Sequence, residues 1–285
     1  MSLHVPAPLA SSCQKTPERR AWLDRLPAAV RILQERWSFT VGSPFDNASC
    51  AWVAPVRCAD GSSAVLKIGM PHMEAEHETQ GLRFWDGEPT VRLLDSDDEP
   101  GAMLLELCEP GTPLLLLPES EQDVIIAGLL HRLWRTPTEP HAFRPLSALL
   151  AYWSNETLLD IDRWPDPGLV REGLALFEEL ARPARGDVLL ATDLHAANVL
   201  RSERKPWLVI DPKPFIGDPA YDATQHLFNC EERLCSDPDR TISRVADLLG
   251  VDRMRVRLWT FARTAADPRS SWDEDSMALA RRIAP

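Results

Sequence analysis

The stretch that decides the fold of this chain runs from Leu189 to Asp222. It begins Leu189-Leu-Ala-Thr-Asp-Leu-His-Ala-Ala-Asn-Val-Leu200 and, after a polar segment, continues Trp207-Leu-Val-Ile-Asp-Pro-Lys-Pro-Phe-Ile-Gly-Asp-Pro-Ala-Tyr-Asp222. Asp193 stands five residues before Asn198, and Asp211 ends the apolar run 207–210. The apolar residues on either side of the polar segment predict two short strands joined by a turn. We expect this hairpin to bring Asn198 and Asp211 close together.

These residue types suit phosphoryl transfer. The reaction needs one carboxylate for the attacking hydroxyl, and an amide oxygen with a second carboxylate to hold Mg²⁺. The interval from Asp193 to Asn198 matches the D-x-x-x-x-N of a kinase catalytic loop, and Asp211 falls where the metal-binding aspartate is expected. We therefore predict Asp193 as the catalytic base and Asn198 and Asp211 as metal ligands. The alternative is that all three are ordinary turn or strand-end residues. It would explain either half of the pattern on its own, but it explains less well why both halves occur in this order.

The same segment resembles the aminoglycoside phosphotransferase family of antibiotic kinases, in which H-G-D-x-x-x-x-N is followed by I-D. The run from Trp207 to Tyr221 is similar to the W-L-x-I-D-P-K-P-x-x-G-D-P-A-Y runs of its streptomycin 6-kinase and hydroxyurea-kinase branch. One departure is Ala191-Thr192, where the family usually has His-Gly. The resemblance implies an α+β, two-lobed protein-kinase-like fold that uses ATP and Mg²⁺. Residues 1–108 would form a small antiparallel-sheet lobe for nucleotide, and residues 109–285 a larger helical lobe for catalysis and substrate binding.

A nucleotide-binding lobe should carry a lysine on a strand and a glutamate on the following helix. Ser63-Ala-Val-Leu-Lys67-Ile is an apolar strand with a single lysine, whose compact ammonium suits nucleotide phosphates. The spacing of apolar residues in 73–85 predicts a helix. By resemblance, Glu78 on this helix holds Lys67, with Glu74 as the alternative. A solvated lysine on an edge strand is the competing interpretation of Lys67.

Two further segments complete the predicted nucleotide site. Residues 39–56 indicate strand, polar turn and strand, and a turn around Ser43 could lay backbone N–H groups against phosphates. An ordinary hairpin turn fits that segment equally well, because it has a single glycine. By resemblance, the strand from Ala102 leads into a hinge where backbone groups from Glu106 to Cys108 bind adenine.

Residues after Asp211 suggest supporting roles. Lys213 could stabilise phosphate charge during transfer, as an arginine finger does in related enzymes. Asp218-Pro219 is a typical helix start, with a capping aspartate and proline at the first helical position. The resemblance also implies that Asp218 braces the catalytic loop.

The net charge of −12 argues against a nucleic-acid partner and suits a cationic small molecule, although acidity is also a general solubility device. Most acidic residues of the carboxyl-terminal half are expected to be solvated surface. The candidates for contact with the substrate are Asp222, Glu231, Glu232, Asp273 and, as an aromatic surface, Trp272.

Composition places the chain among globular proteins that bury a proper core, with 285 residues of which 44% are hydrophobic. The sequence has no apolar run of about eighteen residues and no secretory leader, so we expect neither a membrane span nor export. The six cysteines lack paired C-x-x-C spacing and are expected to be reduced thiols. We predict a monomeric cytoplasmic protein.

The motifs predict an ATP- and Mg²⁺-dependent phosphotransferase, and the resemblance implies that it phosphorylates a hydroxyl of a streptomycin-like antibiotic and so gives resistance. Two alternatives stay open. One is a kinase of the same fold that acts on a nucleoside antibiotic or another small alcohol. The other is a catalytically inactive, nucleotide-binding pseudokinase, whose one support is the missing histidine. The sequence does not identify the acceptor hydroxyl.

Overall fold

The computed structural model describes residues 3–99, 101–161, 164–269 and 273–285. The chain forms two compact units. Unit 1 comprises Met1–Gly111 and Ser202–Leu208, and unit 2 comprises Thr112–Arg201 and Val209–Pro285. The turn of the predicted hairpin therefore belongs to unit 1, although the chain on either side of it belongs to unit 2. Within the described ranges, no helix has the length and apolar character needed to cross a membrane.

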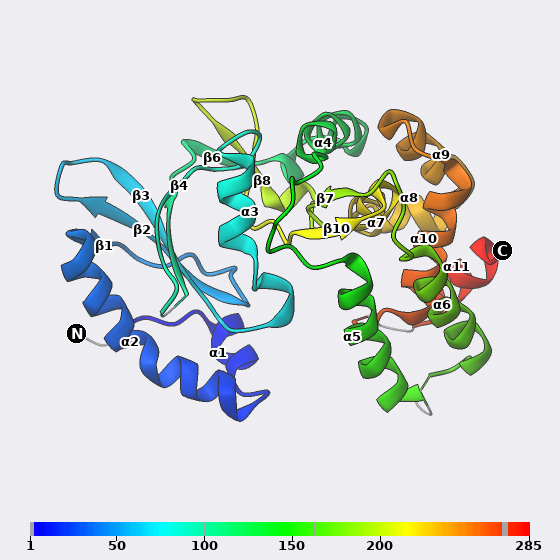
Figure 1. Cartoon of the computed structure of the whole chain (residues 1–285), viewed down its shortest axis with the longest axis horizontal. Helices are drawn as coiled ribbons and strands as arrows, with labels where there is room; N and C mark the ends of the chain where they lie inside the picture. Colours follow the sequence, from blue (N-terminus) through cyan, green and yellow to red (C-terminus); the bar gives the residue numbers. More distant parts are fainter. Residues whose placement is uncertain (1–2, 100, 162–163, 270–272) are drawn as a thin grey trace. The chain divides into compact units, whose positions relative to one another are not determined.

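Unit 1 is built on an antiparallel sheet (Figure 1). The order of its strands is β1-β2-β3-β5-β4. Its elements, in chain order, are α1 (Ala7–Cys13), α2 (Pro17–Trp37), β1 (Phe39–Val41), β2 (Ala51–Cys58), β3 (Ser63–Gly69), η1 (Met73–Ala75), α3 (Glu78–Trp85), β4 (Leu93–Asp97) and β5 (Ala102–Glu106). The 3₁₀ turn η1 and the helix α3 together replace the single helix predicted for 73–85.

The alternation of side chains along β3 determines where Lys67 lies. Leu66 and Ile68 belong to the buried core that the sheet shares with α1 and α2. Because successive strand residues point to opposite faces of a sheet, Lys67 lies on the other face. There it meets Glu78, the first residue of α3. The strand pattern and the helix start thus place these two side chains together.

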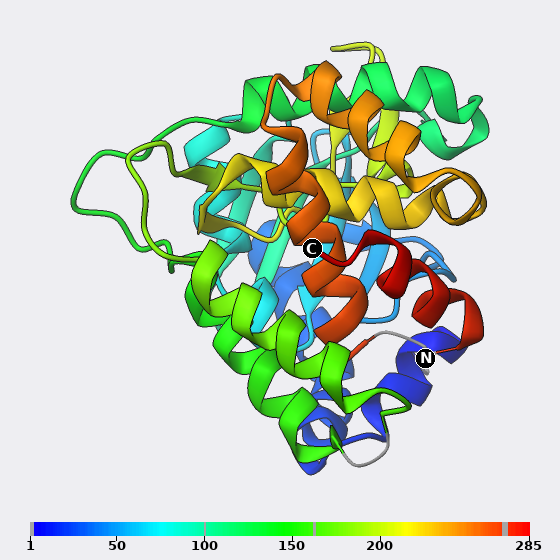
Figure 2. The same cartoon turned by 90° about the vertical axis from the view of Figure 1, so that its right-hand side faces the viewer.

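Unit 2 is mainly helical, and α10 runs through the middle of its helices (Figure 2). The bounds after β5, in chain order, are β6 (Pro110–Pro113), η2 (Leu114–Leu116), α4 (Glu119–Leu133), α5 (Leu146–Leu159), α6 (Pro167–Leu180), β7 (Val188–Leu190), η4 (Ala196–Asn198), β8 (Val199–Ser202), β9 (Leu208–Val209), β10 (Phe215–Gly217), α7 (Pro219–Asn229), α8 (Glu231–Ser236), α9 (Pro238–Leu249), α10 (Arg253–Ala266) and α11 (Glu274–Ile283). The predicted hairpin is present as β8 and β9, which form a small sheet with β6 in the order β6-β8-β9.

The strands β7 and β10 form a short antiparallel pair, with β7 just before the Asp193 loop and β10 just after the segment that contains Asp211. Leu190 pairs with Phe215, and both side chains are fully buried. A glycine is needed at Gly217, because a Cβ there would lie 2.7 Å from Cβ of Leu146 on α5. The pair brings the residues after β7 next to those before β10.

The predicted α+β fold class is confirmed, with an antiparallel sheet in unit 1 and mostly helices in unit 2. The helix start predicted at Asp218-Pro219 is present as the first turn of α7. The helices α1 and α8 and the strands β7 and β10 were not predicted. All four are short, so their local pattern is too brief to distinguish them from turns.

Candidate active site

The backbone around Asp193 forms a tight loop held by its own hydrogen bonds. The N–H of Asp193 donates to the carbonyl of Ala191 at 2.7 Å, and the N–H of Lys213 donates to the same carbonyl at 2.9 Å. The carbonyl of Asp193 accepts a bond of 3.0 Å from Nδ2 of Asn198. None of these bonds uses the carboxylate of Asp193, so the loop leaves that group for chemistry.

Thr192 adopts a left-handed backbone conformation, with φ of 48°. This region costs a β-branched residue about 1–3 kcal/mol, whereas glycine occupies it freely. Two hydrogen bonds hold the conformation in place: Oγ1 donates to the carbonyl of Lys213 at 2.6 Å, and the N–H donates to Oδ1 of Asp222 at 2.8 Å. Thr192 therefore stands at the position where the resemblance leads one to expect glycine, and its side-chain hydrogen bond stabilises the loop.

Asp222 is not placed to bind substrate, and the prediction for this residue is corrected. It is 1% exposed, and its carboxylate accepts bonds from the N–H groups of Ala191 and Thr192 and from Nε1 of Trp134. Its role is to fix the loop that carries Asp193. The signal in the sequence was its position in the first turn of a helix, between the apolar residues Tyr221 and Ala223.

Asp218, which was expected to brace the catalytic loop, has a different set of partners. Its Oδ1 caps α7 by accepting the N–H of Ala220 at 3.0 Å. Its Oδ2 accepts bonds from Arg255 at 2.5 Å and from Nε1 of Trp259 at 2.7 Å, both on α10. Asp218 therefore ties α7 to α10, and the bracing role belongs to Asp222.

Asp222 should give unfolding a specific pH dependence. Burial raises its pKa to about 6, above the value of about 3.9 expected in the unfolded chain. Between these values the folded state holds a proton that the unfolded state has released, so rising pH lowers the stability. A pKa difference of about two between the folded and unfolded states corresponds to about 3 kcal/mol. We expect the free energy of unfolding of wild type, relative to Asp222→Asn, to fall by about this amount from pH 3 to pH 7.

Urea titrations of both proteins at a series of pH values measure this difference. An identical pH dependence for wild type and Asp222→Asn would contradict the assignment. The comparison between the two proteins removes the contribution of other titrating groups, since these are shared.

The predicted metal ligands lie side by side in unit 2. The N–H of Ile210 donates to the carbonyl of Asn198 at 2.9 Å, which joins the residue before Asp211 to Asn198. Asp211 has a left-handed backbone with φ of 54°, and its Oδ1 forms an ion pair with Nζ of Lys213. Lys213 is 5% exposed, so this cation is held beside the carboxylate. The expectation that the hairpin brings Asn198 and Asp211 together is confirmed.

Burial changes the proton affinities of the two titrating side chains in the loop. It raises the pKa of Asp193, although the nearby ammonium of Lys213 opposes the shift. It lowers the pKa of His195, against the attraction of the Asp193 carboxylate, so the imidazole is neutral near pH 7. A carboxylate of raised pKa is a stronger proton acceptor, as general base catalysis requires.

In unit 1, Lys67 and Glu78 form a buried ion pair. Nζ of Lys67 lies 2.6 Å from Oε1 and 2.7 Å from Oε2 of Glu78. The residues are 7% and 2% exposed, which excludes a solvated lysine on an edge strand. The structure thus shows the predicted pairing with Glu78.

The other predicted nucleotide contacts also lie in unit 1. Ser43 is exposed in the connection between β1 and β2. Glu106 ends β5, and its N–H donates to the carbonyl of Arg92 at 2.9 Å. Cys108 is buried, and burial raises its pKa to about 12, so it is a protonated thiol. Its sulfur therefore serves as a packing group.

The remaining substrate candidates are scattered over unit 2. Glu231 and Glu232 are exposed in the first turn of α8. Asp273 is exposed and caps α11 by accepting the N–H of Ser276 at 2.8 Å. Trp272 lies outside the described residues.

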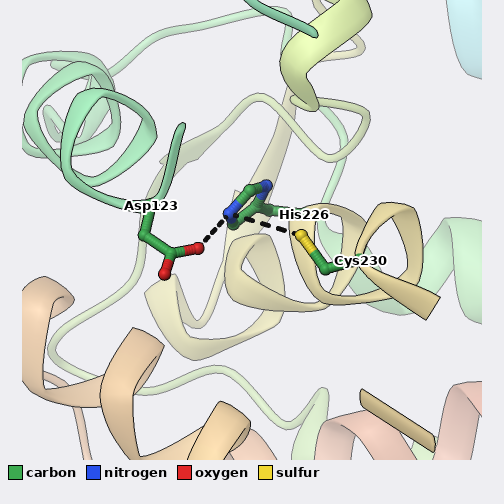
Figure 3. A group of neighbouring side chains, drawn as sticks. All are labelled: Asp123, His226 and Cys230. Carbon is green, nitrogen blue, oxygen red and sulfur yellow. Dashed lines mark hydrogen bonds and ion pairs between the residues drawn. The ribbon is translucent and has the colours of Figure 1, made fainter. Parts of the chain in front are cut away.

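A buried group elsewhere in unit 2 has the composition of a metal site. Possible ligand atoms of Asp123, His226 and Cys230 lie within 4.8 Å of one another (Figure 3). The carboxylate of Asp123, however, accepts bonds of 2.7–2.8 Å from Arg233 and Arg244 and shares one of 2.8 Å with His226. Burial raises the pKa of Cys230 to about 11, so it is a thiol. Two guanidinium groups would repel a cation, and we interpret the group as a structural tie between helices.

The fold is that of small-molecule kinases. Choline kinase LicA from Streptococcus pneumoniae matches with a TM-score of 0.62 at 14% sequence identity, over 90% of this chain and 97% of that one. An identity this low shows the fold alone. The protein-kinase-like part of the predicted fold is thereby confirmed.

Comparison of sequences identifies the family. Residues 36–275 match the family described as aminoglycoside/hydroxyurea antibiotic resistance kinase. The chain is 36% identical over 297 residues to streptomycin 6-kinase of Streptomyces griseus, covering 99% of this chain and 94% of that protein. It is 35% identical over 269 residues to hydroxyurea phosphotransferase of Kitasatospora aureofaciens, covering 92% and 78%. The chain belongs to the aminoglycoside/hydroxyurea antibiotic resistance kinase family.

Membership agrees with the resemblance stated from the motifs, and the enzyme class follows. The chain is a nucleotide-using phosphotransferase with a small-molecule acceptor. These relationships give no support to the pseudokinase alternative.

Proposed function

We propose that the chain transfers the γ-phosphoryl group of ATP to a hydroxyl of a cationic, streptomycin-like aminoglycoside. The observation that carries the proposal is the grouping of Asp193, Asn198, Asp211 and Lys213 on one hydrogen-bonded loop system in unit 2. The relationship to a streptomycin 6-kinase over almost the full length supports the acceptor class.

In this proposal Asp193 accepts the proton of the acceptor hydroxyl. The new bond forms between the hydroxyl oxygen and the γ-phosphorus, and the bond from that phosphorus to the β,γ-bridging oxygen breaks, with ADP as the leaving group. The ammonium of Lys213 is buried and forms an ion pair with Asp211. From this position beside the proposed metal ligand, it would stabilise negative charge on the transferring phosphoryl group.

The side chains of Asn198 and Asp211 fit Mg²⁺. Both offer hard oxygen atoms, which this ion prefers. Nδ2 of Asn198 is used by the loop, while its Oδ1 receives no hydrogen bond within the described residues. When bound, Mg²⁺ neutralises charge on the phosphates of ATP.

Unit 1 is proposed to hold the nucleotide. Lys67, fixed by Glu78, would contact the phosphates, the backbone near Ser43 would cover them, and the segment 106–108 would bind adenine. The proposed lobe boundaries remain 1–108 for nucleotide and 109–285 for catalysis and acceptor binding. We propose a monomer acting in the cytoplasm, where the nucleotide is available.

The acceptor is tested by the salt dependence of its KM. A cationic antibiotic should be held by carboxylates, and we propose Glu231, Glu232 and Asp273 for this role, with Trp272 as an aromatic surface. Raising the ionic strength should then raise the acceptor KM, because salt screens exposed charges beyond about 8 Å at physiological concentration. Amide variants of these acidic residues should also raise it, while the KM for ATP stays unchanged.

Asp24→Asn is the matched control, since Asp24 is exposed on α2 in unit 1. A streptomycin KM that salt does not change would overturn the cationic acceptor. Turnover of a nucleoside antibiotic or choline, without turnover of aminoglycosides, would instead favour the other small-alcohol alternative.

A further inference from the structure

The guanidinium of Arg204 is surrounded by acceptors of unit 1. Its Nε and Nη2 donate to Oε1 and Oε2 of Glu106, each at 2.7 Å. Nη1 donates to the carbonyl of Gly87 at 2.9 Å, and Nη2 also donates to the carbonyl of Thr90 at 3.0 Å. Bidentate pairing of this kind fixes orientation as well as charge.

Glu106 is held from a second direction. Its Oε2 accepts the N–H of Arg92 at 2.9 Å, and its own N–H donates to the carbonyl of Arg92. Burial opposes ionisation of this carboxyl group, but the bonds from Arg204 and Arg92 outweigh it and hold the pKa of Glu106 below its ordinary value. The end of β5 is thus fixed through a charged side chain that depends on Arg204.

The place of Arg204 in the chain is unexpected. It lies in the segment Ser202–Leu208, between β8 and β9. Asn198 comes directly before β8, and Asp211 follows soon after β9. From the sequence, this segment is predicted to be the polar turn of the catalytic hairpin. In the structure it packs within unit 1, the unit that carries Lys67 and Glu106.

We propose that Arg204 is a positioning residue of the nucleotide site. It fixes Glu106, and through it the start of the segment 106–108 that is proposed to bind adenine, without touching the nucleotide itself. The inference rests on the proposed function of that segment. It assigns to the hairpin a second role besides carrying the metal ligands at its two ends.

The neighbouring Lys205 provides a matched control in the same turn. Its Nζ lies 2.8 Å from Oε2 of Glu88, and both side chains are 42% exposed. The side chains of Arg204 and Glu106 are 20% and 16% exposed. Exposed single ion pairs contribute little, because solvent and salt screen them. A general effect of charge in this turn would therefore appear in both lysine and arginine variants, and a positioning effect in the arginine variant alone.

The experiment measures the Kd of ATP by calorimetry, together with kcat and both KM values, for Arg204→Gln, Arg204→Lys, Glu106→Gln and Lys205→Gln. We expect Arg204→Gln to raise the Kd of ATP by about fivefold or more, as loss of a bidentate charged pair implies. The acceptor KM should change less than about twofold, and Lys205→Gln should resemble wild type. Arg204→Lys should restore part of the affinity, and the double variant Arg204→Gln with Glu106→Gln should lose little beyond Arg204→Gln.

The outcomes separate this inference from the proposed function. Failure of the wild-type protein to bind ATP would overturn the proposed function. Normal ATP binding by wild type and by Arg204→Gln alike would overturn the positioning role, even if the melting temperature falls. If Arg204→Gln does not fold, Arg204→Lys and Glu106→Gln decide the question by the same criterion.

Discussion

Replacing Asp193 with asparagine is expected to lower kcat by about 10²-fold or more, because a positioned proton acceptor is lost. The change is nearly isosteric, and the loop should keep its shape. Its hydrogen bonds come from the backbone of Asp193, from Asn198 and from Lys213, and none of them uses the carboxylate. The Kd of ATP should therefore stay close to that of wild type.

Steady-state kinetics at saturating ATP and acceptor give the comparison, with the melting temperature and ATP binding as controls for folding. Turnover within a few-fold of wild type would remove Asp193 from the mechanism. A loss of ATP binding would instead indicate that the variant disturbs the loop.

Replacing Asp211 with alanine is expected to abolish Mg²⁺-dependent turnover, whereas Asn198→Ala should retain residual activity. A carboxylate neutralises a cation and an amide only coordinates it, so the charged ligand should matter more. Alanine also strains the left-handed backbone that Asp211 adopts. Asp211→Asn is therefore the matched variant, because asparagine tolerates that conformation and removes the charge.

Titration of Mg²⁺ in ATP-binding and turnover assays measures the effect. If both Asp211 variants lose Mg²⁺-dependent turnover, the loss results from removal of the charge. If only the alanine variant loses it, the loss results from strain in the backbone. An unchanged Mg²⁺ dependence in both variants would show that Asp211 is not a metal ligand.

Local signals predicted much of the fold. Thr16 caps the helix α2 by accepting the N–H of Arg19, and Pro17 occupies its first position, so its start was readable from sequence. A capping aspartate followed by proline marks the starts of α7 and α9 in a similar way. The strand with Lys67 and the hairpin with Asn198 and Asp211 followed from apolar patterns and turn residues.

The features that sequence did not reveal depend on partners far along the chain. Asp222 and Asp218 are both acidic residues at the start of α7, and only their partners tell them apart. Thr192 lies 30 residues from Asp222, and Arg204 lies 98 residues from Glu106. Periodicity and capping rules describe neighbours within a few turns, so they carry no information on such pairs.

The conformation of Thr192 bears on how relatives of this chain are recognised. A signature that demands histidine and glycine before the aspartate would discard the present sequence as a degenerate copy. Here the left-handed turn survives without glycine, because a hydroxyl and a distant carboxylate stabilise it together. In this chain the intact loop therefore depends on the Thr192 hydroxyl and on the Asp222 carboxylate, which lies 30 residues further along the sequence.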